Sequence, residues 1–172
     1  MRFIALFFLV TIFSCKEPLP VQQPVGTPLP KFEYSYIPVA SDWVCTGAYS
    51  TLYSIGSVAI TYRSPDPGKP SASVRLVNKV FHDLSRASRG TLSFGLLPQS
   101  VPTGSTFIVQ AGGATVGSGV IVSGLNPVME LPQFALKDSV QFNFTFAFAR
   151  TLNAPSYTCA LTLTDIQLDA WE

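Results

Sequence analysis

The sequence predicts an all-β fold, a two-sheet antiparallel β-sandwich of about eight strands, and three observations support this prediction. Between Val140 and Ala149, four Phe residues alternate with small or polar residues, and a period of two places them on one face of a strand. Short apolar runs separated by Gly and Pro recur along the chain. Charged residues make up 12% of the chain, against about 25% in ordinary globular domains, which fits a sandwich with few solvated helical faces.

The predicted strands follow one another at short spacing, and each ends at turn-forming residues. This regular spacing is typical of sandwiches and barrels. The predicted strands are Ser57–Arg63, Ser73–Phe81, Gly90–Leu97, Thr106–Ala111, Gly119–Ser123, Val128–Leu136, Val140–Ala149 and Cys159–Ala170.

The segment from Ser73 to Arg89 fits two structures. Apolar residues from Val74 to Leu84 fall at helical spacing, with basic residues on the opposite face and Gly90 as a stop signal. Alternatively, Val74, Leu76 and Val80 alternate as in a strand. We favour a strand over Ser73–Phe81 followed by a basic loop, because the flanking segments are all predicted to be β.

Residues 1–14 have the features of a signal peptide. Arg2 precedes an unbroken apolar run from Phe3 to Phe13. This run is too short to cross a hydrocarbon core of about 30 Å as a helix, but it has the length of a signal-peptide apolar region. The alternative, a buried N-terminal strand or helix, is disfavoured because the run shows no amphipathic pattern.

The end of this run indicates how the chain is anchored. Ile12-Phe13-Ser14-Cys15 resembles the lipobox of bacterial lipoproteins, although Phe13 replaces the usual small residue. The resemblance implies that Cys15 is lipidated and becomes the mature N-terminus. Lys16 and Glu17 resemble the charged export signals of surface-exposed Gram-negative lipoproteins. We therefore expect an outer-membrane lipoprotein of the cell envelope, held in the membrane by its N-terminal lipid and facing outward.

Residues 15–31 form the predicted tether, and residues 32–172 form the predicted domain. The tether carries prolines at positions 18, 20, 24, 28 and 30. Such a segment favours an extended polyproline-type conformation of about 3.1 Å per residue, so it can hold a domain away from a membrane.

The cysteine count leads to a disulfide prediction. The chain has three cysteines, and an exported protein seldom keeps an unpaired one. With Cys15 lipidated, Cys45 and Cys159 remain to pair in an oxidising compartment. A disulfide closing so long a loop would stabilise the domain by up to about 4–5 kcal/mol. The alternative is that Cys45 and Cys159 are two separate buried thiols.

The order of strands resembles the eight-stranded jelly-roll domains of carbohydrate-binding modules and other galactose-binding-like folds. The resemblance is carried by the strand pair SVRLVNK…RGTLSFGLLP and the closing strand CALTLTDIQLDAW, and it covers roughly Asp42 to Glu172. It implies a jelly-roll-like sandwich and suggests glycan binding.

Residues that could support catalysis are scarce. His82 is the single histidine, and we expect it to be exposed in a basic loop. The predicted domain contains three glutamates, of which Glu33 lies at its start, Glu172 at its end and only Glu130 in between, whereas glycoside hydrolysis needs two carboxylates across the bond. Asp165 and Asp169 share the last predicted strand, where we expect them to serve turns or edges. The sequence thus predicts a protein that is not an enzyme; a polysaccharide lyase using His82 is the least implausible exception.

Metal, cofactor and nucleic-acid binding are also not expected. Zinc would need further ligands beside one histidine, and no acidic run is present to bind calcium. Removal of residues 1–14 takes away Arg2, which leaves ten of eleven basic residues against ten acidic ones. A net charge near zero provides no general attraction to nucleic acid.

Two functions from different classes remain. The first is a carbohydrate-binding module in which Trp43, Tyr49, Tyr53 and Tyr62 stack on sugar rings. The second is a structural or protein-interaction subunit of a cell-surface assembly, suggested by the apolar composition and the near-zero charge. Partners would accordingly be a glycan or a surface protein.

Overall fold

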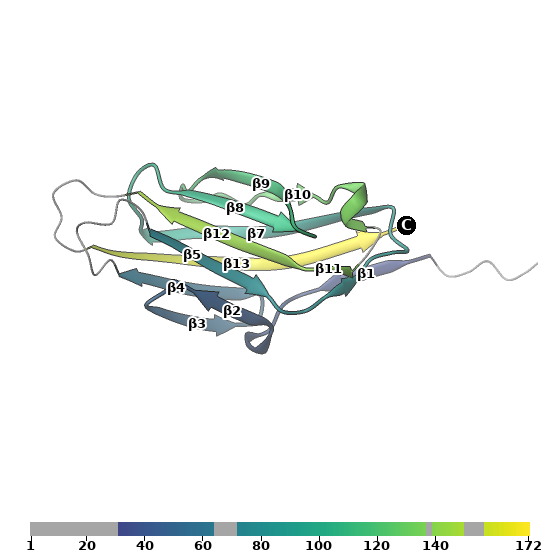
Figure 1. Cartoon of the computed structure of the whole chain (residues 1–172), viewed down its shortest axis with the longest axis horizontal. Helices are drawn as coiled ribbons and strands as arrows, with labels where there is room; N and C mark the ends of the chain where they lie inside the picture. Colours follow the sequence, from purple (N-terminus) through teal and green to yellow (C-terminus); the bar gives the residue numbers. More distant parts are fainter. Residues whose placement is uncertain (1–30, 64–71, 137–138, 150–156) are drawn as a thin grey trace, which may run out of the picture. The chain divides into compact units, whose positions relative to one another are not determined.

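The computed structural model describes residues 31–63, 72–136, 139–149 and 157–172. The predicted signal peptide, the lipobox with Cys15, and nearly all of the tether lie outside these residues. The described residues form an almost entirely β structure with two main antiparallel sheets, and Figure 1 shows the strands of these sheets overlying one another. The predicted all-β sandwich is therefore confirmed. No helix in the described ranges is long and apolar enough to span a membrane.

Sheet A is built around β13, which pairs with β7 along its length, with β4 over its first half and with β1 over its last residues. The outer strands β10 and β3 pair with β7 and β4. Its strands are β1 (Glu33–Tyr36), β3 (Ser50–Ser54), β4 (Ser57–Arg63), β7 (Arg89–Ser100), β10 (Val128–Glu130) and β13 (Thr158–Trp171).

Sheet B has the strand order β2-β5-β12-β8-β9. A short antiparallel pair, β6 with β11, and two 3-10 helices complete the described structure. The strands of sheet B are β2 (Trp43–Thr46), β5 (Ala72–Asn78), β8 (Thr106–Ala111), β9 (Ala114–Val120) and β12 (Phe142–Phe148). The short elements are β6 (His82–Asp83), β11 (Ser139–Val140), η1 (Ala40–Asp42) and η2 (Gln133–Leu136).

The eight predicted strands all have a counterpart; β4 and β8 have the predicted bounds, and the bounds of the other six differ. The ambiguous segment forms a strand that ends at Asn78, followed by β6, so the favoured strand interpretation holds. The predicted strand over 128–136 is split: β10 ends before Pro132, and η2 follows it. Proline lacks the N–H that a sheet ladder requires, which accounts for the break. Strands β1, β2 and β3 were not predicted.

The core lies between the two sheets, and β12 supplies much of it. The four Phe side chains of this strand are all buried, with exposed fractions of 1% or less. They face sheet A, where Phe94 meets the Phe144 ring edge-on with ring centroids 4.9 Å apart. The period-two pattern read from the sequence thus corresponds to the inner face of sheet B.

The predicted disulfide is absent, because Cys45 and Cys159 are free thiols. Cys45 lies on edge strand β2 opposite Leu76, level with Phe144 on β12. Cys159 lies beside Tyr62, whose ring stacks on Phe148. Cys45 is thus aligned with Phe144 and Cys159 with Phe148, and these two positions are four residues, or roughly 13 Å, apart along β12. A disulfide needs Cα atoms about 4.4–6.8 Å apart.

Burial raises the pKa of both thiols, that of Cys159 to about 11. A neutral thiol is a weak nucleophile. The structure therefore supports the alternative of two separate thiols, which act as small apolar side chains.

Candidate functional site

The four aromatic residues proposed from the sequence do not form one exposed surface. Trp43 points into the core, is 5% exposed, and packs edge-on against the Phe142 ring at 5.7 Å. Tyr62 stacks on Phe148 and Tyr53 packs against the core, so both rings are partly covered. These positions fit packing roles rather than contact with a ligand.

Tyr49 differs from the other three, because it is 70% exposed. It lies directly before β3, and the Arg63 guanidinium carbon is 5.9 Å from its ring centroid. An isolated exposed ring with a cation beside it offers little enclosure to a ligand.

The outward-facing side of sheet A offers a better candidate, which we call the sheet A face. Along β13, buried Leu168 and Ala170 alternate with Gln167, Asp169 and Trp171, which therefore point outward. Neighbouring strands contribute further polar side chains by register. Across the face they form the rows Glu130–Thr91–Asp169–Ser35 and Val128–Ser93–Gln167.

Hydrogen bonds hold part of this face in place. The Gln167 side-chain amide donates to the Asp169 carboxylate at 2.9 Å and lies 3.3 Å from the Ser35 hydroxyl. The Asp169 oxygens therefore keep a defined position while retaining free acceptor capacity for a ligand.

Trp171 lies at the end of the face and is its exposed aromatic residue. Its indole is 37% exposed, and the register places Arg89 on one side of it and Glu33 on the other. Trp171 lines two hollows: one of about 660 Å³, shared with Arg89 and Glu130, and one of about 530 Å³, shared with Glu33. A flat aromatic ring flanked by charged hydrogen-bonding groups suits a ligand with both apolar and hydroxylated faces.

A third hollow, of about 650 Å³, lies farther along the same face, where β13 is irregular. The pairing of β13 with β7 shifts between Thr164 and Gln167. Within this bulge Asp165 has a φ of 51°, a left-handed conformation that is uncommon for any residue other than glycine. Asp165 and Asp169 were expected to serve turns or edges. Instead, Asp169 lies inside sheet A, between Thr91 of β7 and Ser35 of β1, and Asp165 lies in the bulge.

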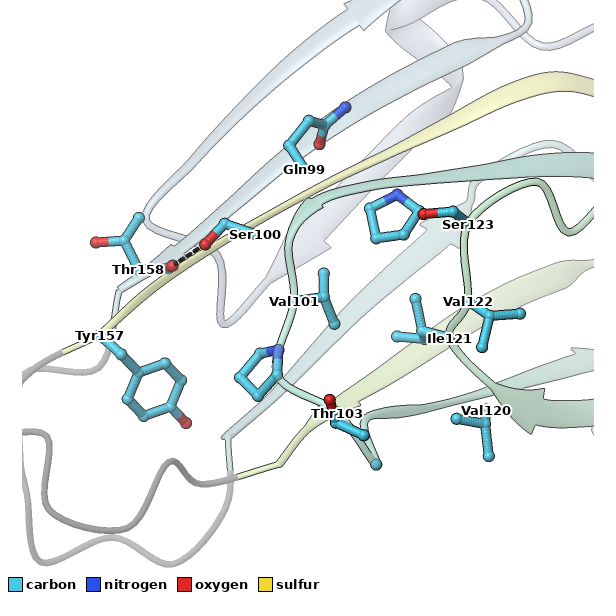
Figure 2. A pocket seen from close by; sticks show the side chains of 13 residues that line it. Gln99, Ser100, Val101, Thr103, Val120, Ile121, Val122, Ser123, Tyr157 and Thr158 are labelled. Atoms are coloured by element: carbon cyan, nitrogen blue, oxygen red, sulfur yellow. Dashed lines mark hydrogen bonds between the residues drawn. The ribbon is translucent and has the colours of Figure 1, made fainter.

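A fourth hollow, of about 510 Å³, lies at the opposite end of β13 and is shown in Figure 2. Side chains from three segments surround it, 98–104, 120–123 and 157–158. Tyr157 is its aromatic residue, and the Ser100 hydroxyl donates to the Thr158 carbonyl at 3.2 Å. No charged side chain of the described residues lines this hollow.

His82 is buried rather than exposed as expected, with 1% of its surface accessible. Its Nε2 lies 3.3 Å from Asn78 Oδ1 and its Nδ1 lies 2.7 Å from the Tyr34 hydroxyl. Asn78 in turn donates to the Tyr36 hydroxyl, which donates to Asp42 at 2.6 Å. The basic segment was predicted to be solvated, but this polar network satisfies the imidazole inside the fold.

Burial lowers the pKa of His82 to about 4, although the nearby Asp42 carboxylate opposes this shift. The imidazole is therefore neutral at pH 7. It lines none of the four hollows. Among the described residues, no group of three or more His, Cys, Asp or Glu side chains is placed to hold a metal ion.

The sequence does contain a signal for the sheet A face. In the closing strand, Gln167, Asp169 and Trp171 alternate with apolar residues, which is the pattern of a strand with one solvated face. The aromatic candidates predicted from the sequence all lie in the first half of the domain, and this strand contributed only to the predicted fold. Trp171 was therefore missed.

A likeness to one solved structure supports the fold. The carbohydrate-binding module CBM27-1 of Caldicellulosiruptor saccharolyticus, solved with mannohexaose, matches with a TM-score of 0.54 and 10% identity, over 78% of this chain and 96% of its own. The N-terminal cellulose-binding domain of Cellulomonas fimi β-1,4-glucanase C matches with a TM-score of 0.45 and 17% identity, over 76% and 90%. No protein-family model and no curated protein matches the sequence. The domain thus has a β-sandwich fold like that of carbohydrate-binding modules.

Proposed function

We propose that this protein is a lipoprotein anchored in the outer membrane by lipid on Cys15 and displayed at the cell surface, and that its β-sandwich binds a glycan chain. The observation that carries the glycan proposal is the sheet A face, where the exposed Trp171 ring continues into rows of hydroxyl, amide and carboxylate groups. The fold, shared with carbohydrate-binding modules, supports it.

The chemistry of the face matches that of a sugar chain. A sugar ring has an apolar face that stacks on an aromatic ring, and hydroxyl groups around its edge that exchange hydrogen bonds. Six residues of β13 separate Trp171 from Asp165, or roughly 20 Å of strand. The face is therefore long enough for an oligosaccharide rather than a single sugar.

The proposed role is binding rather than catalysis. The single histidine is buried, neutral at pH 7, and committed to Tyr34 and Asn78. It therefore has no access to a ligand on the sheet A face as a general base, which argues against the lyase alternative.

Glycan binding is tested with the full-length protein in detergent against a panel of oligosaccharides and polysaccharides. We expect selective binding, and we expect Trp171→Ala to weaken it by about tenfold or more, because a tryptophan that stacks on a ligand often contributes disproportionately to binding. Isothermal titration calorimetry measures the dissociation constants.

Tyr49→Ala and Tyr157→Ala are the matched controls, because both remove an aromatic ring that lines none of the three hollows along the sheet A face. Binding that is lost with Tyr157→Ala and retained with Trp171→Ala would move the site to the hollow of Figure 2. An absence of binding across the whole panel would rule out the glycan proposal.

The anchor is tested separately. Replacement of Cys15 by alanine should remove the acyl chains and release the protein from the membrane fraction, because the thiol is the proposed attachment point. Mass spectrometry of the purified protein and fractionation of cells measure these two effects. A wild-type protein without lipid, still retained in the membrane, would contradict the proposal.

A second candidate function, docking to a surface protein, has one observation in its favour. Aliphatic side chains are exposed on sheet A, on the edge strand β3, in the β3–β4 turn and on β7: Leu52 and Ile55 are each 76% exposed, and Leu97 is 48% exposed. The register places Leu52 and Leu97 in one row across the sheet. If the glycan panel is negative, capture of a protein partner that is lost with Leu52→Ser would favour this alternative.

A further inference from the structure

The bulge in β13 holds an aspartate in an unusual conformation at the floor of the third hollow. Asp165 is the one residue other than glycine with a positive φ in the described part of the chain. Its side chain is exposed and lines the hollow of about 650 Å³. Strained backbone of this kind persists where the surrounding structure fixes it, and it is frequent at ligand sites.

Backbone hydrogen bonds to the β3–β4 turn hold the bulge in place. The Ile166 N–H donates to the Gly56 carbonyl at 2.9 Å, and the Gly56 N–H donates to the Pro38 carbonyl at 2.8 Å. Gly56 itself has a φ of 64°. These two hydrogen bonds hold the backbone next to Asp165, so the fold sets the direction in which its Cα–Cβ bond leaves the strand.

A glycine on β7 makes room for two of the polar side chains that line the hollow. A Cβ on Gly95 would lie 2.9 Å from Asn126 Oδ1 and would also collide with the Thr164 hydroxyl. Because Gly95 has no side chain, the Asn126 amide and the Thr164 hydroxyl both occupy the face directly above β7. The hollow therefore presents an amide, a hydroxyl and a carboxylate.

The remaining lining is largely aliphatic, with Ile37, Ile55 and Leu97 exposed by 50%, 76% and 48%. Of the described residues that line the hollow, Asp165 alone carries a charge. A ligand here would meet apolar walls, hydrogen-bonding groups and one negative charge.

We infer that this hollow is a ligand-binding subsite that selects neutral sugar units and rejects acidic ones, with Asp165 as its specificity-determining residue. The inference rests on the proposed glycan function and assigns its ligand class. The Asp165 carboxylate accepts hydrogen bonds from sugar hydroxyl groups, and Asn126 and Thr164 bind others. The aliphatic side chains contact the apolar face of the ring. A uronate carboxylate would be placed next to Asp165 with no cation among the described residues that line the hollow, and the like charges would repel each other.

The test measures binding of the full-length protein in detergent to four hexasaccharides. Three are neutral, namely mannohexaose, cellohexaose and xylohexaose, and one is anionic, hexagalacturonate. We expect at least one neutral probe to bind at least about tenfold more tightly than hexagalacturonate. Asp165→Asn should weaken binding of that neutral probe by about tenfold, and it should reduce the ratio between the affinities for the neutral probe and for hexagalacturonate. The reason is that asparagine tolerates the left-handed conformation but lacks the charge.

Asp165→Gly separates binding from folding. Glycine adopts a positive φ without steric cost, so we expect an unchanged or raised melting temperature together with the same loss of binding. Asp83→Asn is the matched control for net charge, because Asp83 is exposed on β6, outside sheet A. This control should leave both affinities unchanged.

Two results would overturn the inference while the glycan proposal stands. In the first, both Asp165 variants bind the neutral probe as tightly as the wild-type protein does, whereas Trp171→Ala loses binding. In the second, the wild-type protein binds hexagalacturonate as tightly as it binds the neutral probes. A wild-type protein that binds no glycan, in this set or in the wider panel, would remove the glycan proposal and the inference together.

Discussion

Phe144→Ala is expected to lower the free energy of unfolding by about 3–5 kcal/mol, the usual cost of truncating a fully buried aromatic ring. Phe144 is 0% exposed. Its ring packs against Phe94 at 4.9 Å, Trp43 at 6.2 Å and Phe142 at 6.1 Å. Because it touches residues of both sheets, the cavity left by its removal cannot be filled by movement of one sheet alone.

Urea denaturation followed by circular dichroism measures this loss. The matched control is Thr145→Ala, the next residue on β12, which points outward and is only partly buried; its cost should stay below about 1 kcal/mol. If Phe144→Ala does not fold, Phe144→Leu should give a smaller but measurable loss. Equal effects at positions 144 and 145 would mean that the core does not lie on this face of β12.

The second large effect is expected from acid. His82 has a pKa of about 4 in the folded protein and about 6.5 in an unfolded chain. Between these values the unfolded chain binds a proton that the folded protein does not. Stability is therefore fully present above pH 6.5 and declines as the pH falls towards 4, by about 3 kcal/mol in total. Below pH 4 the contribution of this residue no longer changes.

Because His82 is the only histidine in the chain, NMR titration of its ring protons measures its pKa directly. Denaturation at pH 7, 5.5 and 4.5 measures the loss of stability. His82→Gln should flatten the dependence above pH 4.5, whatever its effect on stability at pH 7. An imidazole that titrates near 6.5 in the folded protein would contradict its burial against Phe142 and its hydrogen bond from Tyr34.

Local sequence pattern predicted the parts of the fold that depend on one strand at a time. The alternating Phe residues of β12 share one buried face, and β4 and β8 have the predicted bounds. The unpredicted strands of the two main sheets, β1, β2 and β3, are short: β1 reads EYSY, and β2 has four residues. Such segments are strands because a neighbouring strand pairs with them, and pairing is not encoded within four residues.

The candidate site likewise has a part that one strand's pattern predicts and a part that it does not. The outward positions of Gln167, Asp169 and Trp171 follow from alternation within β13, so they were predictable. The left-handed Asp165 was not, because the bulge depends on hydrogen bonds to the β3–β4 turn, more than a hundred residues away in sequence. The packing of the Asn126 and Thr164 side chains over Gly95 was likewise not predictable, because the three residues come from different segments.

The sequence by itself determined that the domain is an antiparallel β-sandwich and which side chains along a strand share a face, because a two-residue period is a local property of the backbone. The tertiary structure alone decided which faces are covered and which strands lie side by side. It separated Cys45 from Cys159, buried His82 and Trp43, and left Trp171 exposed beside Arg89 and Glu33. These outcomes depend on strand pairing and sheet packing between distant segments, which no local pattern contains.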